Sequence, residues 1–242
     1  MSRAKNITAL ILAGGFGTRV KDLLGELPKP MAPVNGKPFI EWIVRWLKAQ
    51  SIRDVIISAG YRAEVIEEYF NTSPVSDINV HCVTESEPMG TGGGLAFAAN
   101  ACNTQPDAWL VLNGDSLIFT DINSVISALN GAEGVIVTRP VTDTSRYGRV
   151  QFNESNRITA FMEKQPGEGQ INAGVYLLNH ALLSTFPESR PLSLESQVFP
   201  QLIQQANGLI AHPVDAPFLD IGTPETLPLA EAFISDNLDQ FS

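Results

Sequence analysis

The sequence predicts an α/β protein built on a Rossmann-like, mixed and mostly parallel sheet flanked by helices. Apolar runs of strand length occur at 7–12, 54–59 and 78–83. Between them, 38–50 and 63–70 carry apolar residues at helical spacing. The resulting order of strand, helix, strand, helix and strand is typical of a doubly wound parallel sheet.

The second half of the chain has a different rhythm. A strand at 109–112, a helix at 121–130 and a strand at 135–138 continue the first pattern. Short β segments then follow one another at 147–152, 158–163 and 171–178. We expect a helix at 193–205 that Pro200 interrupts, a strand at 209–214 and a last helix from about Pro224. The run of consecutive β segments predicts a small antiparallel subregion laid over the sheet.

Length and composition suit one domain over 1–242. A net charge of −10 argues against nucleic acid as a partner, because proteins that bind nucleic acid place clusters of positive side chains against its phosphates. No apolar run is long enough to span a bilayer, and the N-terminus lacks a signal-peptide core. Cys82 and Cys102 form no metal or disulfide pattern. We therefore expect a cytoplasmic protein with neither nucleic-acid nor membrane partners.

A glycine-rich loop follows the first strand. Residues 12–19 read Leu-Ala-Gly-Gly-Phe-Gly-Thr-Arg, and 28–30 read Pro-Lys-Pro. Glycines let backbone N–H groups approach an anion, while Arg19 and Lys29 add positive charge. The loop matches neither the Walker pattern nor the dinucleotide fingerprint. The glycines alone would also suit an ordinary turn, but the two cations favour phosphate binding.

A second glycine-rich stretch, 85–94, precedes a helix expected at 95–101. Loops that follow parallel strands gather at the carboxyl edge of a sheet, so this stretch should face the first loop. A flexible turn is the alternative. Ordering so many consecutive glycines costs chain entropy, which favours a functional reason for them, namely contact with a ligand.

Two aspartates stand in apolar surroundings. Asp115 follows a buried strand, where it is either a turn residue or a Mg²⁺ ligand. Asp220, between Leu219 and Ile221, needs a cation or another partner, since burying a lone carboxylate is costly. A capping network around Thr223 is the structural alternative. The three histidines are scattered and lack ligand spacing.

These motifs, together with Arg146-Tyr147-Gly148, Glu163-Lys164 and Asn172-x-Gly174-x-Tyr176, resemble in type and order those of the sugar-1-phosphate nucleotidyltransferase family. The resemblance covers nearly the whole chain and implies a GT-A-like nucleotidyltransferase fold. It also implies that 1–140 mainly binds the nucleotide and that 141–242 mainly binds the sugar phosphate.

The resemblance also assigns site residues. The implied catalytic residues are Arg19, Lys29, Asp115 and Lys164. The implied nucleotide-binding residues are Leu12, Ala13, Gly14, Gly15, Gly17, Thr18, Arg19, Lys29, Glu85, Glu87, Gly90, Thr91, Gly92, Asn113 and Gly114. The implied sugar-phosphate-binding residues are Tyr147, Gly148, Glu163, Lys164, Asn172 and Gly174. The implied Mg²⁺ ligands are Asp115 and Asp220.

Within the family, residues 27–39, 87–93 and 111–115 are similar to bacterial D-glycero-α-D-manno-heptose 1-phosphate guanylyltransferases. This implies that GTP and the heptose phosphate give a nucleotide sugar for surface polysaccharides and pyrophosphate. The phosphate nucleophile is already deprotonated, so the reaction needs alignment and charge stabilisation rather than a general base.

Several alternatives stay open at this point. Glu85 or Glu87 could accept hydrogen bonds from guanine, but the residues also allow a mannose-1-phosphate guanylyltransferase or a sugar-1-phosphate uridylyl- or cytidylyltransferase. A non-catalytic nucleotide-sugar sensor is disfavoured, because a sensor has no need of both aspartates. The resemblance makes a homodimer plausible, and nothing in the sequence identifies an interface.

Overall fold

The computed structural model describes residues 6–102, 104–162 and 166–242. Its strands are β1 (Ile7–Ala13), β2 (Pro33–Val34), β3 (Lys37–Pro38), β4 (Asp54–Ala59), β5 (Asn79–Thr84), β6 (Ala108–Asn113), β7 (Ser116–Ile118), β8 (Gly134–Val141), β9 (Arg149–Phe152), β10 (Ile158–Met162), β11 (Gly169–Asn179), β12 (Leu209–Pro213) and β13 (Phe218–Asp220). Its α-helices are α1 (Lys21–Leu24), α2 (Phe39–Ala49), α3 (Ala63–Thr72), α4 (Gly90–Ala101), α5 (Ile122–Ala128), α6 (Phe199–Leu202) and α7 (Ala230–Asp236).

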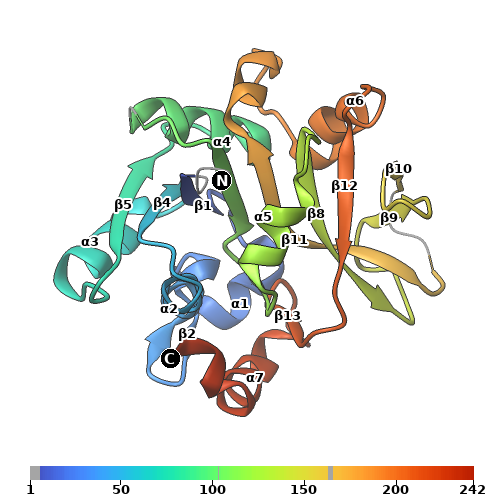
Figure 1. The fold of residues 1–242 in the computed structure, drawn as a ribbon. Helices are drawn as coiled ribbons and strands as arrows, with labels where there is room; N and C mark the ends of the chain where they lie inside the picture. The colour runs from blue at the N-terminus through green and yellow to red at the C-terminus, as the bar shows by residue number, and fades with distance from the viewer. Residues whose placement is uncertain (1–5, 103, 163–165) are drawn as a thin grey trace.

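A mixed sheet forms the centre of the molecule (Figure 1). Its main path runs β10-β9-β11-β6-β1-β4-β5, and β8, paired with β11, carries β12 on its other side. The four strands β6, β1, β4 and β5 are parallel. Within the described residues, the α/β fold and the mixed sheet predicted from the sequence are confirmed.

The central strand β1 is buried on both faces, as expected of a parallel strand between two helical layers. Ile11 packs in one hydrophobic cluster with the apolar stripes of α2, α3, α5 and α7. Leu10 packs in the other cluster with α4 and α6. The alternating side chains of one strand therefore hold both layers of the core in place.

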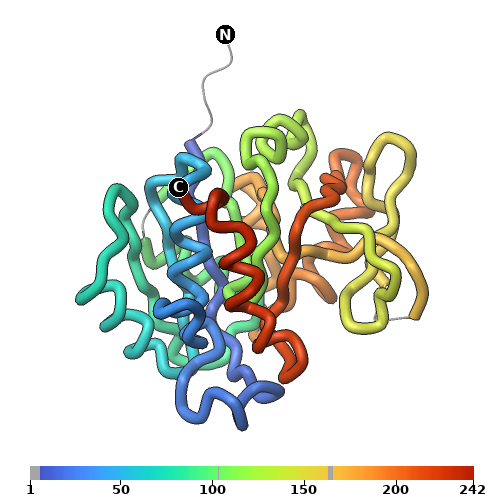
Figure 2. The backbone as a smooth tube through the Cα atoms, turned by 90° about the horizontal axis from the view of Figure 1, so that it is seen from below, coloured from blue at the N-terminus to red at the C-terminus, as the bar shows by residue number. Residues whose placement is uncertain are grey.

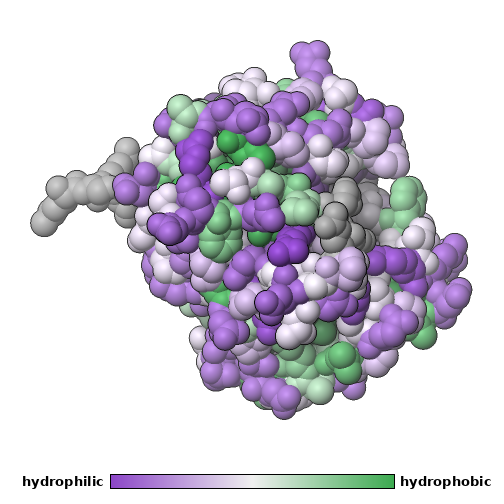
Figure 3. Space-filling view, turned by 90° about the vertical axis from the view of Figure 1, so that its right-hand side faces the viewer, coloured by the Kyte–Doolittle hydropathy of each residue, from purple (hydrophilic) through white to green (hydrophobic). Residues whose placement is uncertain are grey.

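The predicted antiparallel strands are present, and they continue the same sheet at its edge. β11 pairs antiparallel with β6, β8 and β9. Its register with β8 shifts between Asn172 and Tyr176, and Gly174 there has φ of +76°. Figure 3 shows the face on the side of β9 and β10, where hydrophilic side chains prevail and apolar residues occur in small groups.

The second glycine-rich stretch differs from its prediction, because α4 begins at Gly90 rather than near Leu95. These glycines are helical because another segment packs against them. A Cβ at Gly90 would lie 2.5 Å from the carbonyl oxygen of Leu192, and a Cβ at Gly94 would lie 2.7 Å from Oε1 of Glu85. Close packing, not flexibility, explains this run of glycines.

Two further boundaries were wrong. The last helix begins at Ala230, after a 3-10 turn at Leu227–Leu229, rather than near Pro224. In the predicted 193–205 helix, a π turn at Leu194–Val198 leads directly into α6, where Pro200 occupies an early position that needs no N–H donor. Pro200 therefore marks a change of helical type rather than a break.

The C-terminal residues lie beside α2 (Figure 2). The ring centroids of Trp42 and Phe241 are 5.1 Å apart, and the Asn35 side chain donates a hydrogen bond to the carbonyl oxygen of Glu231. The end of the chain thus completes the helical layer that covers β1. No helix in the described parts of the chain combines the length and apolarity needed to cross a bilayer.

Candidate active site

The first glycine loop leaves β1 at Ala13 and packs tightly against two side chains that were predicted to bind the nucleotide. A Cβ at Gly14 would lie 2.7 Å from Oε1 of Glu85, and a Cβ at Gly17 would lie 2.9 Å from Cβ of Lys29. Gly17 also has φ of +60°, which glycine adopts at little cost. The loop is therefore shaped around Glu85 and Lys29.

This loop forms one wall of a cavity of about 350 Å³. Residues predicted to bind the nucleotide that line it are Leu12, Ala13, Gly14, Gly15, Lys29, Glu85, Gly90, Thr91, Asn113 and Gly114. Gly17, Thr18, Arg19, Glu87 and Gly92 are not among its lining residues. Pro30, Met89 and Pro191 also line it, although none of them was assigned to the site from the sequence.

Glu85 is a buried carboxylate at this cavity. Its Oε1 accepts a hydrogen bond from the Ser58 hydroxyl at 2.7 Å, and its Oε2 accepts one from the Met89 N–H at 3.3 Å. Glu87 is exposed. Of the two glutamates considered for base recognition, only Glu85 lines this cavity.

The first turns of α4 are held by the chain around Leu192. The N–H groups of Gly92 and Gly93 donate to the Leu192 carbonyl at 2.8 and 3.1 Å. These two donors are therefore already used within the protein. The Thr91 hydroxyl, in the same turn, donates to Oε2 of Glu195 at 2.7 Å.

Asp115 and Asp220 come together although 105 positions separate them. β7 follows Asp115 and pairs antiparallel with β13, placing Asp220 opposite Ser116. The Ile221 N–H also donates to the Asp115 carbonyl oxygen at 2.9 Å. A short ladder at the carboxyl end of β6 thus brings both carboxylates to one place.

The charges around these carboxylates form one cluster. Lys29 Nζ makes an ion pair with Asp115. Burial, and then the Asp115 charge, raise the pKa of Asp220, while the Gly222 N–H, Lys29 and Arg19 act in the opposite direction. Two cations and two carboxylates predicted from the sequence thus share one site.

A second cavity, of about 610 Å³, lies beyond this cluster. It is lined by Arg19, Asn113, Asp115, Ser116, Arg146, Tyr147, Gly148, Phe161, Met162, Asn172, Ala173, Gly174, Glu195, Ser196, Pro200, Phe218 and Asp220. Asn113 and Asp115 line both cavities. The two cavities therefore meet at the end of β6.

The junction contains an unsatisfied polar atom. Oδ1 of Asn113 is buried and has no hydrogen-bond partner among the described residues. A Cβ at Gly174 would lie 2.8 Å from Nδ2 of the same side chain, so the β11 bulge needs glycine to pass it. A buried acceptor without a donor is costly, and a bound ligand could supply the donor.

Tyr147 forms part of the wall of the second cavity. Its ring lies 5.5 Å from the Arg146 guanidinium carbon and 5.8 Å from the Phe218 ring. Burial, followed by the charge of Asp220, raises the pKa of its hydroxyl. At neutral pH this hydroxyl is therefore a hydrogen-bond donor at the edge of the acidic pair.

The donor set fits Mg²⁺ bound together with a substrate. In the parts of the chain that the structure describes, no group of three or more His, Cys, Asp or Glu could hold a metal by itself. Mg²⁺ is commonly held by one or two carboxylates plus substrate phosphates. Asp115 and Asp220 supply such a pair; burial, and then the like charge of Asp115, raise the pKa of Asp220.

Some predicted residues lie elsewhere. Glu163 and Lys164 fall outside the described residues. His180 accepts a hydrogen bond from the Trp109 indole, and His212 contacts Ser124. Neither histidine lines a cavity described above. Glu195 was not predicted to be a site residue, because a Glu in a Leu-Glu-Ser-Gln segment reads as an ordinary helical surface residue.

Comparison with known proteins agrees with this geometry. The model of the family described as "Nucleotidyl transferase" matches residues 8–237. The D-glycero-alpha-D-manno-heptose 1-phosphate guanylyltransferase of Campylobacter jejuni is 36% identical over 218 residues, which are 90% of this chain and 95% of that protein. A mannose-1-phosphate guanylyltransferase of Mycobacterium tuberculosis is 35% identical over 90% of this chain and 62% of its own length.

Solved structures give the same result. HddC from Yersinia pseudotuberculosis superposes with a TM-score of 0.82 at 30% identity, covering 94% of this chain and 98% of that one. The same protein complexed with GMP-PN superposes with a TM-score of 0.81. The motifs, the fold and these matches lead to one conclusion: the chain belongs to the nucleotidyl transferase family.

Proposed function

We propose that this enzyme transfers GMP from GTP to a sugar 1-phosphate, with D-glycero-α-D-manno-heptose 1-phosphate as the preferred acceptor, and releases pyrophosphate. The observation that carries the proposal is the meeting of two cavities at Asn113 and Asp115. One is walled by the glycine loop, and the other by polar groups that suit a sugar. The relatives from C. jejuni and Y. pseudotuberculosis support the choice of heptose phosphate and of a guanine nucleotide.

The proposal divides the chain as the sequence suggested. The first cavity takes its lining from the nucleotide half, 1–140, apart from Pro191. The second takes residues from both halves.

A homodimer and a cytoplasmic location belong to the same proposal. Light scattering of the purified protein would test the first, and fractionation of the source cells would test the second.

The main barrier to this reaction is the approach of two polyanions. Two unit charges 4 Å apart repel by about 1 kcal/mol in water and about 4 kcal/mol at an effective dielectric constant of 20. Lys29 lines the first cavity and Arg19 lines the second, where they would lower this repulsion. We assign Lys164 to the sugar phosphate by family resemblance, and Glu163 to the sugar hydroxyls.

Asp115 and Asp220 would hold Mg²⁺, which supplies charge neutralisation and orientation to the triphosphate when bound. Lys29 is ion-paired with Asp115. On binding, Lys29 would turn from that carboxylate to a phosphate oxygen. The attacking sugar phosphate needs no general base, and neither described cavity is lined by a histidine. The chain's contribution is in-line alignment and stabilisation of charge.

Base recognition is assigned to Glu85. A carboxylate accepts several hydrogen bonds, so Glu85 could accept from the guanine edge while keeping its Ser58 and Met89 donors. It could not donate, which uracil and thymine carbonyls would require. We assign Glu87, which is exposed, no direct base contact.

A pyrophosphate-release assay tests the proposal. The purified protein is incubated with Mg²⁺, each of GTP, ATP, UTP and CTP, and the 1-phosphates of the heptose, mannose and glucose. We expect the highest kcat/KM for GTP with the heptose phosphate. Higher kcat/KM with mannose 1-phosphate would instead favour the activity named for the M. tuberculosis relative. No turnover with any pair would overturn the proposal.

A further inference from the structure

A continuous run of hydrogen bonds connects the two cavities through the protein. The Thr91 hydroxyl donates to Oε2 of Glu195 at 2.7 Å, and the Tyr176 hydroxyl donates to Oε1 at 3.2 Å. The Asn172 amide donates to the Tyr176 oxygen at 2.8 Å. Oδ1 of Asn172 accepts from the Gly174 N–H at 2.9 Å. Each bond uses a separate donor and a separate acceptor site.

The two ends of this run lie at different sites. Thr91, on α4, lines the first cavity, whereas Asn172 and Gly174, on β11, line the second. Glu195 lines only the second cavity. Tyr176 is fully buried and lines neither cavity. A change at the Tyr176 hydroxyl would therefore reach a ligand only through its neighbours.

The central bond is stable across the neutral pH range. Burial, and then the Glu195 charge, raise the pKa of Tyr176 well above its ordinary value, so the hydroxyl keeps its proton and remains a donor. The Tyr176 ring packs on Phe199 with centroids 5.1 Å apart, which restricts its movement. A rigid ring with a permanent donor can transmit a displacement at one end of the run to the other.

We propose that Glu195 and Tyr176 are positioning residues that couple the nucleotide cavity to the sugar-phosphate cavity. A nucleotide that orders Thr91 would fix Glu195 and, through Tyr176, the Asn172–Gly174 bulge. By linkage, a sugar phosphate that orders the bulge would strengthen nucleotide binding by the same factor. The proposal rests on the function proposed above, since it needs both ligands.

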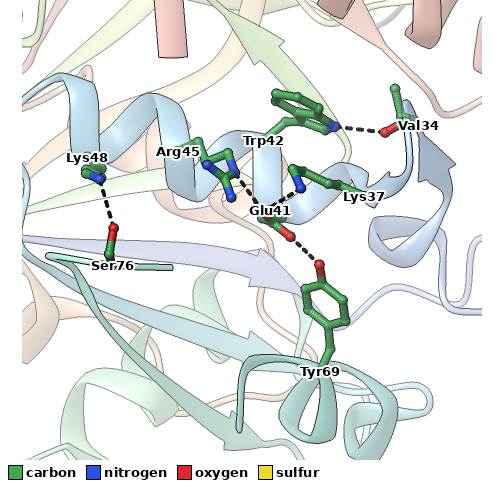
Figure 4. Close-up of polar contacts among 8 residues, drawn as sticks. All are labelled: Val34, Lys37, Glu41, Trp42, Arg45, Lys48, Tyr69 and Ser76. Carbon is green, nitrogen blue, oxygen red and sulfur yellow. Dashed lines mark hydrogen bonds and ion pairs between the residues drawn. The ribbon is translucent and has the colours of Figure 1, made fainter. Parts of the chain in front are cut away.

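The molecule contains a matched control for this bond. Tyr69 donates its hydroxyl to Glu41 in a second Tyr–Glu pair, which joins α3 to α2 (Figure 4). Neither residue lines a cavity described above. Removal of the Tyr69 hydroxyl should therefore weaken packing without affecting communication between the two sites.

The test is calorimetric binding to the full chain with Mg²⁺. The nucleotide is the α,β-methylene analogue of GTP, whose α–β bridge resists cleavage, and the acceptor is D-glycero-α-D-manno-heptose 1-phosphate. In the wild type we expect each ligand to lower the dissociation constant of the other by about tenfold. Tyr176→Phe should reduce this factor to less than about twofold, with each ligand alone binding within about threefold of wild type. Tyr69→Phe should keep the wild-type factor.

Glu195→Gln provides an independent variant of nearly the same shape. The NH2 group that replaces one carboxylate oxygen cannot accept a hydrogen bond. Either Tyr176, or Thr91 together with Ser193, therefore loses its acceptor, and we expect the coupling factor to fall as in Tyr176→Phe. In steady-state assays, both variants should raise the KM for one substrate when the other is saturating and leave it near the wild-type value when the other is limiting. A merely structural role would lower the Tm and leave the coupling factor unchanged.

The outcomes separate this proposal from the proposed function. Wild-type protein that binds both ligands independently, or variants that retain the wild-type coupling factor, would overturn the coupling and leave the function intact. An equal loss of coupling in Tyr69→Phe would overturn it as well. Wild-type protein that binds neither ligand would overturn the function, and the coupling with it.

Discussion

Two clusters of charged side chains in this molecule are built in opposite ways. Glu41, on α2, is only 3% exposed. It forms ion pairs with Arg45 Nε at 2.6 Å and Lys37 Nζ at 3.8 Å, and it accepts a hydrogen bond from the Tyr69 hydroxyl (Figure 4). At the carboxyl end of β6, two carboxylates lie close enough for Asp115 to raise the pKa of Asp220.

This difference separates a charge that the fold satisfies from charges that we propose act in the reaction. At Glu41 the chain itself supplies cations and a donor, so the carboxylate is satisfied when the protein has folded. At Asp115 and Asp220 the nearby cations, Lys29 and Arg19, do not restore the ordinary pKa of Asp220. A bound metal cation would supply the remaining positive charge.

The largest expected effect comes from the functional group. Asp115→Asn should lower kcat by at least about a hundredfold, because it removes a charge that acts on the reacting phosphates. The Tm should stay close to the wild-type value, since the amide removes a like charge from beside Asp220. Pyrophosphate release and thermal unfolding measure the two quantities. Activity within a few-fold of wild type would mean that Asp115 has no essential part in the reaction.

A substitution at Glu41 should instead affect stability and leave activity nearly unchanged. Glu41→Gln should lower the free energy of unfolding by about 2 kcal/mol, because the two cations lose the charge they pair with and one of the two acceptor oxygens is replaced by NH2. Its kcat/KM at a permissive temperature should stay within about threefold of wild type. Urea unfolding measures the loss, and Glu68→Gln, at an exposed position of α3, is the control. A large fall in activity without a fall in stability would assign Glu41 to the site.

The smallest effect is a change in pH dependence. Burial, and then the hydrogen bond to Glu41, raise the pKa of Tyr69 from 10.0 to about 12. The folded state thus keeps a proton that the unfolded state loses. The stability that this hydroxyl adds is fully present below pH 10 and is lost as the pH rises to about 12.

The variant Tyr69→Phe should therefore be less stable than wild type by about 1 kcal/mol near neutral pH. The difference should shrink at pH values between 10 and 12. Urea unfolding of both proteins across this range measures it. A difference that grows with pH would mean that the Tyr69 hydroxyl does not act as the donor to Glu41.

Much of the site could be predicted because its chemistry is local. The glycine loop after β1 and Asp115 after β6 occupy strand ends, and parallel strands bring such ends to one edge of a sheet. The second glycine-rich stretch lies beside the first loop, as predicted. It was expected to be a loop, however, and it is helical from Gly90. Its glycines form the first turns of α4 because Leu192, a hundred residues later, packs against them.

What the sequence determined by itself was the order of the elements and the residue types at the strand ends. Hydrophobic spacing and turn residues favour a helix, a strand or a loop through neighbours a few positions away. The order of the elements can therefore be predicted without knowing any distant contact. The tertiary structure decided the register that sets Asp220 beside Ser116, the junction of two cavities at Asn113, and the bonds that join Thr91 to Tyr176 through Glu195. Such contacts depend on how the whole sheet packs against its helices, which no local propensity encodes.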